Sequence, residues 1–267
     1  MKQAIGIAMV CLGLAATANA AALAQDMRRH IDLSSPEMTS AEMTRGDVET
    51  ALDKAVGAAP ADFTGKRLSG LDLSGLNLSR AVLRAARLNK TKLAGARLDR
   101  AVLDQAWLAE ADLTGASLKG ASLYASQMPR ARLDGADLSE ARVAADLTGA
   151  SLVGASIANA RLGADMRNQS MGLMRTVLKS ANLERVNARG ADMSRVDLEF
   201  SSLKGADLTD ASLKGAQLGG ADLTGATVVD TDFDGADLAS AKLIAPVGLD
   251  RAKNFDNTKN RERLIRK

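Results

Sequence analysis

The stretch AWLAE-ADLTG-ASLKG, residues 106–120, shows one five-residue pattern three times in succession. A leucine occupies the third place of each unit, and alanine stands two places before it. The same spacing of large apolar residues runs unbroken from Phe63 to Val143, and it returns from Leu173 to Leu243. A repeat this strict predicts a solenoid, in which each short unit packs only against neighbouring copies.

A five-residue period fits neither an ordinary helix nor a flat strand. On an α-helix each step of five turns the side chain by about 140°, so the leucines form no stripe. On a strand an odd period places successive leucines on opposite faces. The chain is therefore expected to turn a corner in every unit, with leucine and the preceding alanine inside. Glycines such as Gly95 and Gly115 recur two places after leucine, where a corner requires an unusual φ.

Units such as 111–115 and 221–225, both ADLTG, resemble the pentapeptide repeat family, whose consensus is A-(D/N)-L-x-x. The resemblance covers residues 61–245. It implies an all-β fold, a right-handed quadrilateral β-helix with four units in each coil. About nine coils follow from the unit count, and a spacing of ~4.8 Å between coils gives a rod of ~45 Å.

The first 24 residues have the three parts of a secretory signal peptide. Lys2 precedes an apolar run over residues 4–16, and small-x-small cleavage sites end at Ala20 and Ala24. We expect cleavage after Ala24, with Ala20 as the alternative, and export to the periplasm or the medium. The apolar run is shorter than the ~20 residues of a spanning helix, so no membrane span is expected after cleavage. The one cysteine, Cys11, lies within this segment.

The repeats are flanked by segments that we expect to cover the ends of the solenoid. Residues 25–60 contain a helix signal, with Thr44 as N-cap, Asp47 at the third helical position and Met43 facing Val48. An exposed solenoid end leaves core and strand edges unpaired, which favours a helical cap over a separate functional module. Residues 246–267 are expected to form a C-terminal cap and a basic tail. The apolar residues expected to pack at the two ends are Val48, Ala51, Leu52, Ala55, Val56, Leu249 and Phe255.

The repeat is irregular near residues 143–173. The spacing falls to four between Val143 and Leu147 and again between Leu162 and Met166, then rises to seven before Leu173. These changes cancel, so the sequence predicts a bulge or small loop over residues 163–172 and a return to the original register.

Charge is distributed unevenly along the chain, although the total is only +3. Residues 66–103 carry nine basic side chains and two acidic ones, whereas residues 191–243 carry four basic and ten acidic ones. Residues 20 apart should stack on neighbouring coils, which places Arg67 below Arg87 and Trp107. Stacked like charges are unfavourable unless an anion neutralises them, and Arg87 is placed to lie on the indole ring. The sequence therefore suggests a surface for an anionic partner, formed by Arg67, Arg80, Arg87, Lys90, Arg100 and Trp107.

The composition offers little for catalysis. A single histidine, His30, and a single cysteine exclude the common transition-metal and nucleophile arrangements. Stacking sets Asp192 below Ser212 and Asp197 below Gln217, so no carboxylate ladder for a metal is expected. We expect no catalytic residues, no metal site and no cofactor.

The preferred interpretation is a non-enzymatic exported solenoid that binds or spaces other molecules, either an anionic envelope polymer or a protein. The resemblance implies one alternative, because some family members are dimeric acidic mimics of DNA that bind type II topoisomerases. The export signal and the basic N-terminal half oppose that alternative, and no nucleic-acid partner is expected. A polysaccharide-active β-helix enzyme is a second alternative. A homodimer is compatible with the opposite charges of the two halves.

Overall fold

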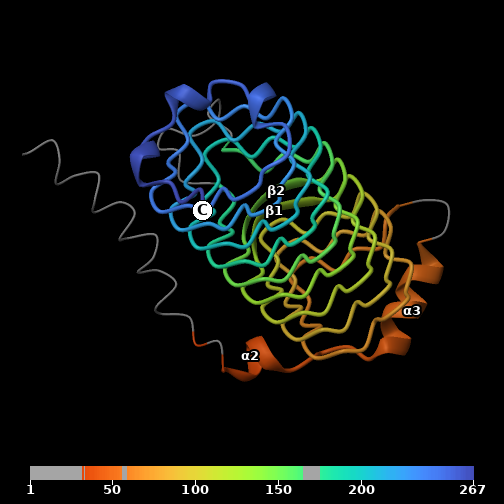
Figure 1. Cartoon of the computed structure of the whole chain (residues 1–267). Helices are drawn as coiled ribbons and strands as arrows, with labels where there is room; N and C mark the ends of the chain where they lie inside the picture. Colours follow the sequence, from red (N-terminus) through yellow and green to blue (C-terminus); the bar gives the residue numbers. More distant parts are fainter. Residues whose placement is uncertain (1–31, 33, 56–58, 165–174) are drawn as a thin grey trace, which may run out of the picture. The chain divides into compact units, whose positions relative to one another are not determined.

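The computed structural model describes residues 32, 34–55, 59–164 and 175–267. It divides into two compact units, Met1–Thr39 and Ser40–Lys267. The described part of the first unit contains one short helix, α2 (Pro36–Thr39). The second unit contains helix α3 (Arg45–Lys54) and a stack of regular coils (Figure 1). The expected signal peptide, His30, Val56 and Leu173 lie outside the described residues.

Each coil has four short sides, and single parallel bridges join every side to the same side of the next coil. Bridges in the first half connect residues that are twenty apart, as in Arg67 to Arg87 and Arg87 to Trp107. Since each unit has five residues, four units complete one coil. We call the sides A to D, and their bridging residues in the second coil are Val82 on side A, Arg87 on side B, Lys92 on side C and Arg97 on side D.

The core is a stack of leucines and alanines. Leu68, Leu88 and Leu108 of side B have no exposed surface, nor do Ala86 and Ala106. Backbone bonds follow the same ladder, for example from Leu88 N to the carbonyl oxygen of Trp107 at 2.6 Å. Because every coil repeats these contacts, apolar burial and backbone pairing hold the solenoid together along its whole length.

Threonine replaces alanine at some inner positions without leaving a polar group unsatisfied. The hydroxyl of Thr91 donates to the Leu68 carbonyl oxygen at 2.9 Å, and that of Thr231 donates to Leu208 at 2.7 Å. The buried hydroxyls of Ser69 and Ser79, by contrast, have no hydrogen-bond partner among the described residues.

Corners adopt left-handed backbone conformations whether or not they carry glycine. Gly75 has φ 70°, and Arg80, at the next corner, has φ 63°. The turn is closed by a bond from Ala81 N to the Leu78 carbonyl oxygen at 3.0 Å. The corner N–H also donates to the coil above, as from Arg80 to Asp99 at 2.8 Å. Together these two hydrogen bonds offset the strain of a non-glycine residue at positive φ.

The shortened unit at Val143 is absorbed as a bulge. Strand β1 (Ser122–Gln127) pairs in parallel with strand β2 (Arg142–Asp146), and the register shifts between Tyr124 and Gln127. After the shift, bridges connect residues nineteen apart, such as Arg142 and Arg161. Asp146 pairs with Val177, 31 residues later, and most of the loop expected over residues 163–172 lies outside the described residues. From Val177 the spacing is again twenty until the last coil, whose bridges span 21 to 23 residues, as from Asp232 to Lys253 and from Lys242 to Ile265.

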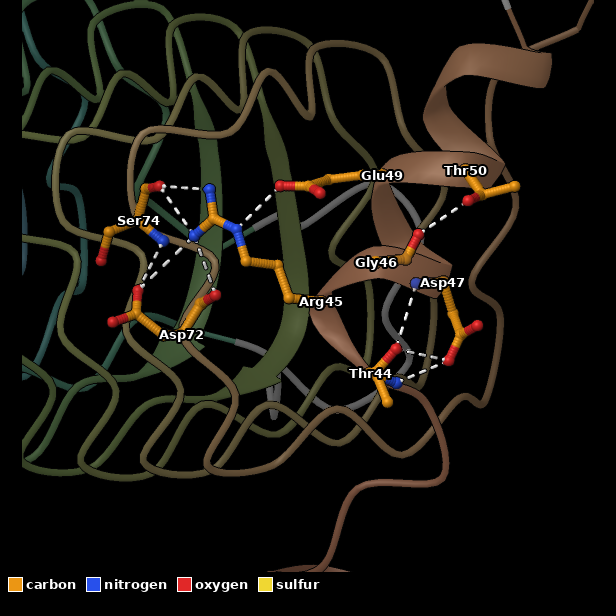
Figure 2. A network of polar contacts seen from close by, with 8 residues as sticks. All are labelled: Thr44, Arg45, Gly46, Asp47, Glu49, Thr50, Asp72 and Ser74. Carbon is orange, nitrogen blue, oxygen red and sulfur yellow. Dashed lines mark hydrogen bonds and ion pairs between the residues drawn. The ribbon is translucent and has the colours of Figure 1, made fainter.

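Helix α3 packs against the first coils. Thr44 is its N-cap, and the Thr44 hydroxyl accepts from Asp47 N at 3.2 Å while Asp47 Oδ2 accepts from Thr44 N at 2.8 Å (Figure 2). Val48 is fully buried in the same cluster as Phe63. Figure 2 also shows Arg45, whose guanidinium donates to the carbonyl oxygens of Asp72 at 3.0 Å and Ser74 at 3.3 Å.

The last coil is built differently from the others, with a short 3₁₀ helix at each corner. These helices are η1 (Leu249–Arg251), η2 (Phe255–Asn257) and η3 (Arg261–Arg263). Phe255 meets Phe233 edge to face with ring centroids 5.5 Å apart. The end of the chain, expected to be a basic tail, also forms part of this coil, because Ile265 bridges Lys242 and Leu264 packs against the core. Among the described residues no helix is long and apolar enough to span a bilayer.

Candidate anion-binding surface

The six residues proposed from the sequence lie at three separate places on the solenoid. Arg67, Arg87 and Trp107 follow one another on side B, as the twenty-residue spacing predicts. Lys90 occupies the corner between sides B and C. Arg80 and Arg100 occupy the corner between sides D and A, which we call the D–A corner, so the whole of side A separates them from side B. The six residues therefore do not form one site.

Arg67 and Lys90 have carboxylate partners within the chain. Arg67 Nε lies 3.6 Å from Glu42 Oε2, in the segment just before α3. The pKa of Glu42 is lowered, first by the hydrogen bond from the Arg67 backbone and then by the charges of Lys66 and Arg67. Lys90 Nζ lies 3.8 Å from Glu110 Oε2, and Glu110 also accepts from Arg130 at 2.6 Å. Internal pairing makes these two positions less available to an anion.

The side B pair of Arg87 and Trp107 is adjacent in the ladder, and both side chains are partly buried. Arg87 Nη1 donates to the Gly65 carbonyl oxygen of the preceding coil at 3.5 Å. The stacking of this guanidinium on the indole ring stays a prediction.

The structure instead gathers arginines along side A and the corner before it. We call this set the arginine strip: Arg80, Arg84, Arg100, Arg142 and Arg161. Successive bridges on side A join Val82, Val102, Ser122, Arg142 and Arg161. With ~4.8 Å between coils, this run is ~19 Å long.

Charge within the strip is only partly balanced. In the described part of the chain, no carboxylate lies within ion-pair distance of Arg80, Arg100 or Arg161. Arg142 and Arg161 are bridged to each other on neighbouring coils, so two like charges stand side by side. Arg84 helps to lower the pKa of Asp62, after the hydrogen bonds from the Thr64 side chain and backbone. An anion placed on the strip would relieve the repulsion between neighbouring guanidinium groups.

Apolar and aromatic groups lie between the arginines. The Arg142 guanidinium carbon is 4.7 Å from the centre of the Tyr124 ring, a cation–π contact that orients the side chain. Val82 and Val102 are half-buried on the outer surface of side A. The strip therefore offers fixed positive groups separated by surfaces that can contact the apolar parts of a ligand.

Sequence reasoning missed Arg84, Arg142 and Arg161. The pairing of Arg142 with Arg161 depends on the one-residue shift after Val143, which a strict spacing of twenty does not reveal. Aligning the units by their leucines, rather than by residue number, would have brought the two arginines together.

The many aspartates before leucine have a structural role. Asp112 Oδ1 accepts from the Thr114 backbone N–H at 3.0 Å and from its hydroxyl at 2.6 Å, and Asp222 accepts in the same way from Thr224. Burial tends to raise the pKa of Asp222, but the hydrogen bonds from Thr224 and the charges of Lys204 and Lys242 lower it overall. These carboxylates stabilise the turn that follows each short side.

The predicted stacking of the acidic half is also present, since Asp192 pairs with Ser212 and Asp197 with Gln217. In the described ranges no group of three His, Cys, Asp or Glu side chains could hold a metal ion.

A family model described as pentapeptide repeats matches residues 61–100, 96–133, 106–143, 173–210 and 201–239. No curated protein matches the chain. Among solved structures, HetL from Nostoc sp. strain PCC 7120, a pentapeptide repeat protein involved in heterocyst differentiation regulation, is 28% identical, with 82% of this chain and 95% of HetL covered and a TM-score of 0.44. QnrB1, a plasmid-mediated fluoroquinolone resistance protein, is 20% identical, with 72% and 92% covered and a TM-score of 0.39.

A pentapeptide repeat protein from the Arabidopsis thaliana thylakoid lumen is 27% identical, with 41% of this chain and 69% of that chain covered and a TM-score of 0.22. The TM-scores of these three structures are low, and the assignment rests on the family model. Its matches span more than half of the chain and coincide with the buried leucine ladder. The chain belongs to the pentapeptide repeat family, and its repeats form a right-handed β-helix solenoid.

Proposed function

We propose that this protein is a non-enzymatic, exported solenoid that binds an anionic polymer of the cell envelope along the arginine strip. The observation that carries the proposal is a row of exposed arginines, among them Arg80, Arg100 and Arg161, with no carboxylate partner in the described chain. A guanidinium group binds carboxylate or phosphate through two parallel hydrogen bonds, which suits an acidic polymer.

Rigidity supports a binding role. The strip is attached to a ladder in which every coil repeats the same buried leucines and backbone bonds. The backbone that carries the arginines is therefore already ordered, and less conformational entropy is lost when a ligand binds. We also take the solenoid to have about nine coils, closed by α3 at one end and by η1 to η3 at the other.

Export is part of the proposal and follows from the signal peptide expected over residues 1–24. Fractionation of cells that express a C-terminally tagged chain, with mass measurement of the N-terminus, tests it. Protein cleaved after Ala24 or Ala20 in the periplasm or medium supports the proposal. Uncleaved cytoplasmic protein contradicts it and makes topoisomerase binding the next assay.

Binding is tested with a linear polyuronate as the probe and neutral dextran as the control polymer. Isothermal titration calorimetry compares the unmodified protein with a variant carrying Arg80→Ser, Arg100→Ser and Arg161→Ser. We expect the variant to lose affinity for polyuronate by about tenfold or more, because each lost guanidinium removes a charge-assisted contact. Binding by the unmodified protein should weaken steeply as salt is raised.

A matched variant keeps the same net charge change but leaves the strip intact. Lys179, Lys204 and Lys214 lie outside the strip, and each is paired with a carboxylate, at 2.6, 3.8 and 3.0 Å. Their replacement by serine should leave polyuronate affinity within about twofold. An equal loss in both variants would show that binding follows net charge and would contradict a specific strip.

A further inference from the structure

Side A and its first corner carry opposite charges at the two ends of the solenoid. The D–A corner is one continuous ladder, because the corner N–H of Arg80 donates to Asp99, that of Arg100 to Lys119, and so on to Asp210, which donates to Val229. In chain order, the residues at this corner are Arg80, Arg100, Gly120, Glu140, Asn159, Gly190, Asp210 and Asp230. The run begins with two cations and ends with two carboxylates.

We propose that side A is a self-association surface, on which a second copy of this chain packs side A to side A in antiparallel orientation. In a two-fold dimer, if one residue of the first copy contacts a different residue of the second copy, the same contact occurs again with the two copies exchanged. Reversing the ladder sets Arg80 opposite Asp230 and Arg100 opposite Asp210. The same register sets Gly120 opposite Gly190 and Glu140 opposite Asn159. A parallel arrangement would instead place like charges together.

The side chains four places after each D–A corner residue, at the other end of side A, agree with this register. Arg84 follows the corner of Arg80, and Asp234 follows the corner of Asp230, so the two exposed side chains face each other in the dimer. Asp104 and Lys214 form a similar pair, although each also has a partner within its own chain.

Two symmetry-related arginine contacts oppose the register. Arg142 and Arg161 meet near the two-fold axis, where the neighbouring corner brings Glu140 of the other copy close to them. In this register the half-buried Val82 and Val102 lie opposite Asp232 and Ser212 of the other copy, and the two valines lose water in the contact.

The groups at the D–A corner are available for such a contact. Asp210 is exposed, and in the described part of the chain its carboxylate has no cation within ion-pair distance. Other acidic side chains of the C-terminal half are paired internally, such as Asp207 with Arg189 at 3.2 Å and Asp222 with Lys204 at 3.8 Å. Asp230 accepts from Arg251 through Oδ2 alone, which leaves Oδ1 for a second donor.

The contact is long, narrow and polar. Seven coil steps separate Arg80 from Asp230, about 34 Å at the usual strand spacing. Ion pairs between exposed side chains are weak and screened by salt, so we expect a reversible dimer with strong salt dependence. The polymer and a second copy would compete for the same arginines, so dimerisation is measured with no polymer present and can fail or succeed separately from polymer binding.

Analytical ultracentrifugation of the purified protein, in the form that cells accumulate, tests the inference at about 20 mM and about 500 mM salt. We expect a dimer at low salt and a dissociation constant at least about tenfold higher at high salt. Three variants then probe one pair: Arg100→Asp, Asp210→Arg, and the two combined. Each single change should abolish the dimer at low salt, and the combined charge swap should restore it.

These substitutions are mild for the fold, because the D–A corner already carries Arg80 at φ 63° and Asp210 at φ 59°. Thermal unfolding monitored by circular dichroism confirms that each variant is folded. Reversal of Lys92 and Lys242 to Glu, both on side C, is the control and should leave the dimer intact.

A monomer at low salt would overturn the inference. A dimer that survives both single reversals would overturn it as well, because the contact would then lie on another surface. A charge swap that stays monomeric while folded would show that Arg100 and Asp210 do not face each other, and would reject this register.

Discussion

At the scale of single residues, the corner explains a pattern that runs through the whole chain. A large corner residue is often followed, one coil later, by glycine at the same corner. The Cβ of an alanine at position 120 would lie 3.6 Å from Arg100 Cγ, and at position 205 it would lie 3.6 Å from Arg185 Cγ. Long side chains at one corner thus extend over the next corner, and glycine leaves room for them.

Phe200 and Gly220 are the most crowded example. Phe200 is 63% exposed and has φ 58°, and an alanine Cβ at position 220 would lie 2.6 Å from its ring. We predict that Gly220→Ala lowers the free energy of unfolding by about 2 kcal/mol, from strain at positive φ and displacement of the ring.

Gly225→Ala is the matched control, since its φ of 68° is similar and no atom lies within 4 Å of the new Cβ. This variant should lose only about 1 kcal/mol, which is the strain alone. Urea unfolding of both variants measures the two losses in the free energy of unfolding. Adding Phe200→Ala to Gly220→Ala should bring its loss closer to that of Gly225→Ala. Equal losses in the two single variants would show that the ring is not held against Gly220.

At the scale of elements, α3 shows how well local signals predict structure. Thr44 and Asp47 mark the helix start in the sequence, and the structure has both bonds of the capping box there. The contacts of Arg45 with the carbonyl oxygens of Asp72 and Ser74 could not be predicted, because they depend on how the helix is placed on the coils. Sequence periodicity defines an element, whereas its docking depends on tertiary packing.

The capping box predicts an acid-sensitive helix. The hydrogen bond from the Thr44 backbone, followed by that from its hydroxyl, lowers the pKa of Asp47. A carboxyl group with a lowered folded pKa stabilises the fold above its unfolded pKa of about 3.9, and this stability is lost as the pH falls through the folded pKa. Asp47→Asn should therefore reduce amide protection of α3 at pH 7, and the difference from the unmodified protein should vanish in acid.

Hydrogen exchange read out by mass spectrometry, with rates corrected for the intrinsic pH dependence, measures this protection. Asp53→Asn is the control, because Asp53 lies in the last turn of the same helix, where a negative charge is unfavourable. That substitution should not weaken protection at pH 7. A difference between Asp47→Asn and the unmodified protein that persists unchanged in acid would contradict the role of the charge.

At the scale of the whole molecule, the fold followed from the sequence much more fully than the site. The five-residue period predicts the inward leucines, the corners and the stacking of Arg67, Arg87 and Trp107, because all three depend on one repeated geometry. The arginine strip depends on an irregular unit, and the partners Glu42 and Glu110 neutralise cations that the sequence alone left open. Whether a surface charge is neutralised depends on tertiary contacts, which the repeat period does not predict.

The same repetition makes stability a sum of contacts between neighbouring coils. Leu152 lies in the fifth coil, near the middle of the solenoid, and is almost fully buried, so Leu152→Ala should cost about 3 kcal/mol through lost burial and a residual cavity. A weakened middle coil uncouples the two halves, so we predict that hydrogen exchange will show separate opening of the coils on either side. Leu243→Ala, close to the last coil, should instead increase exchange only there. Uniform loss of protection in both variants would mean that the solenoid unfolds as one cooperative unit, in which a defect at any coil is felt equally by all.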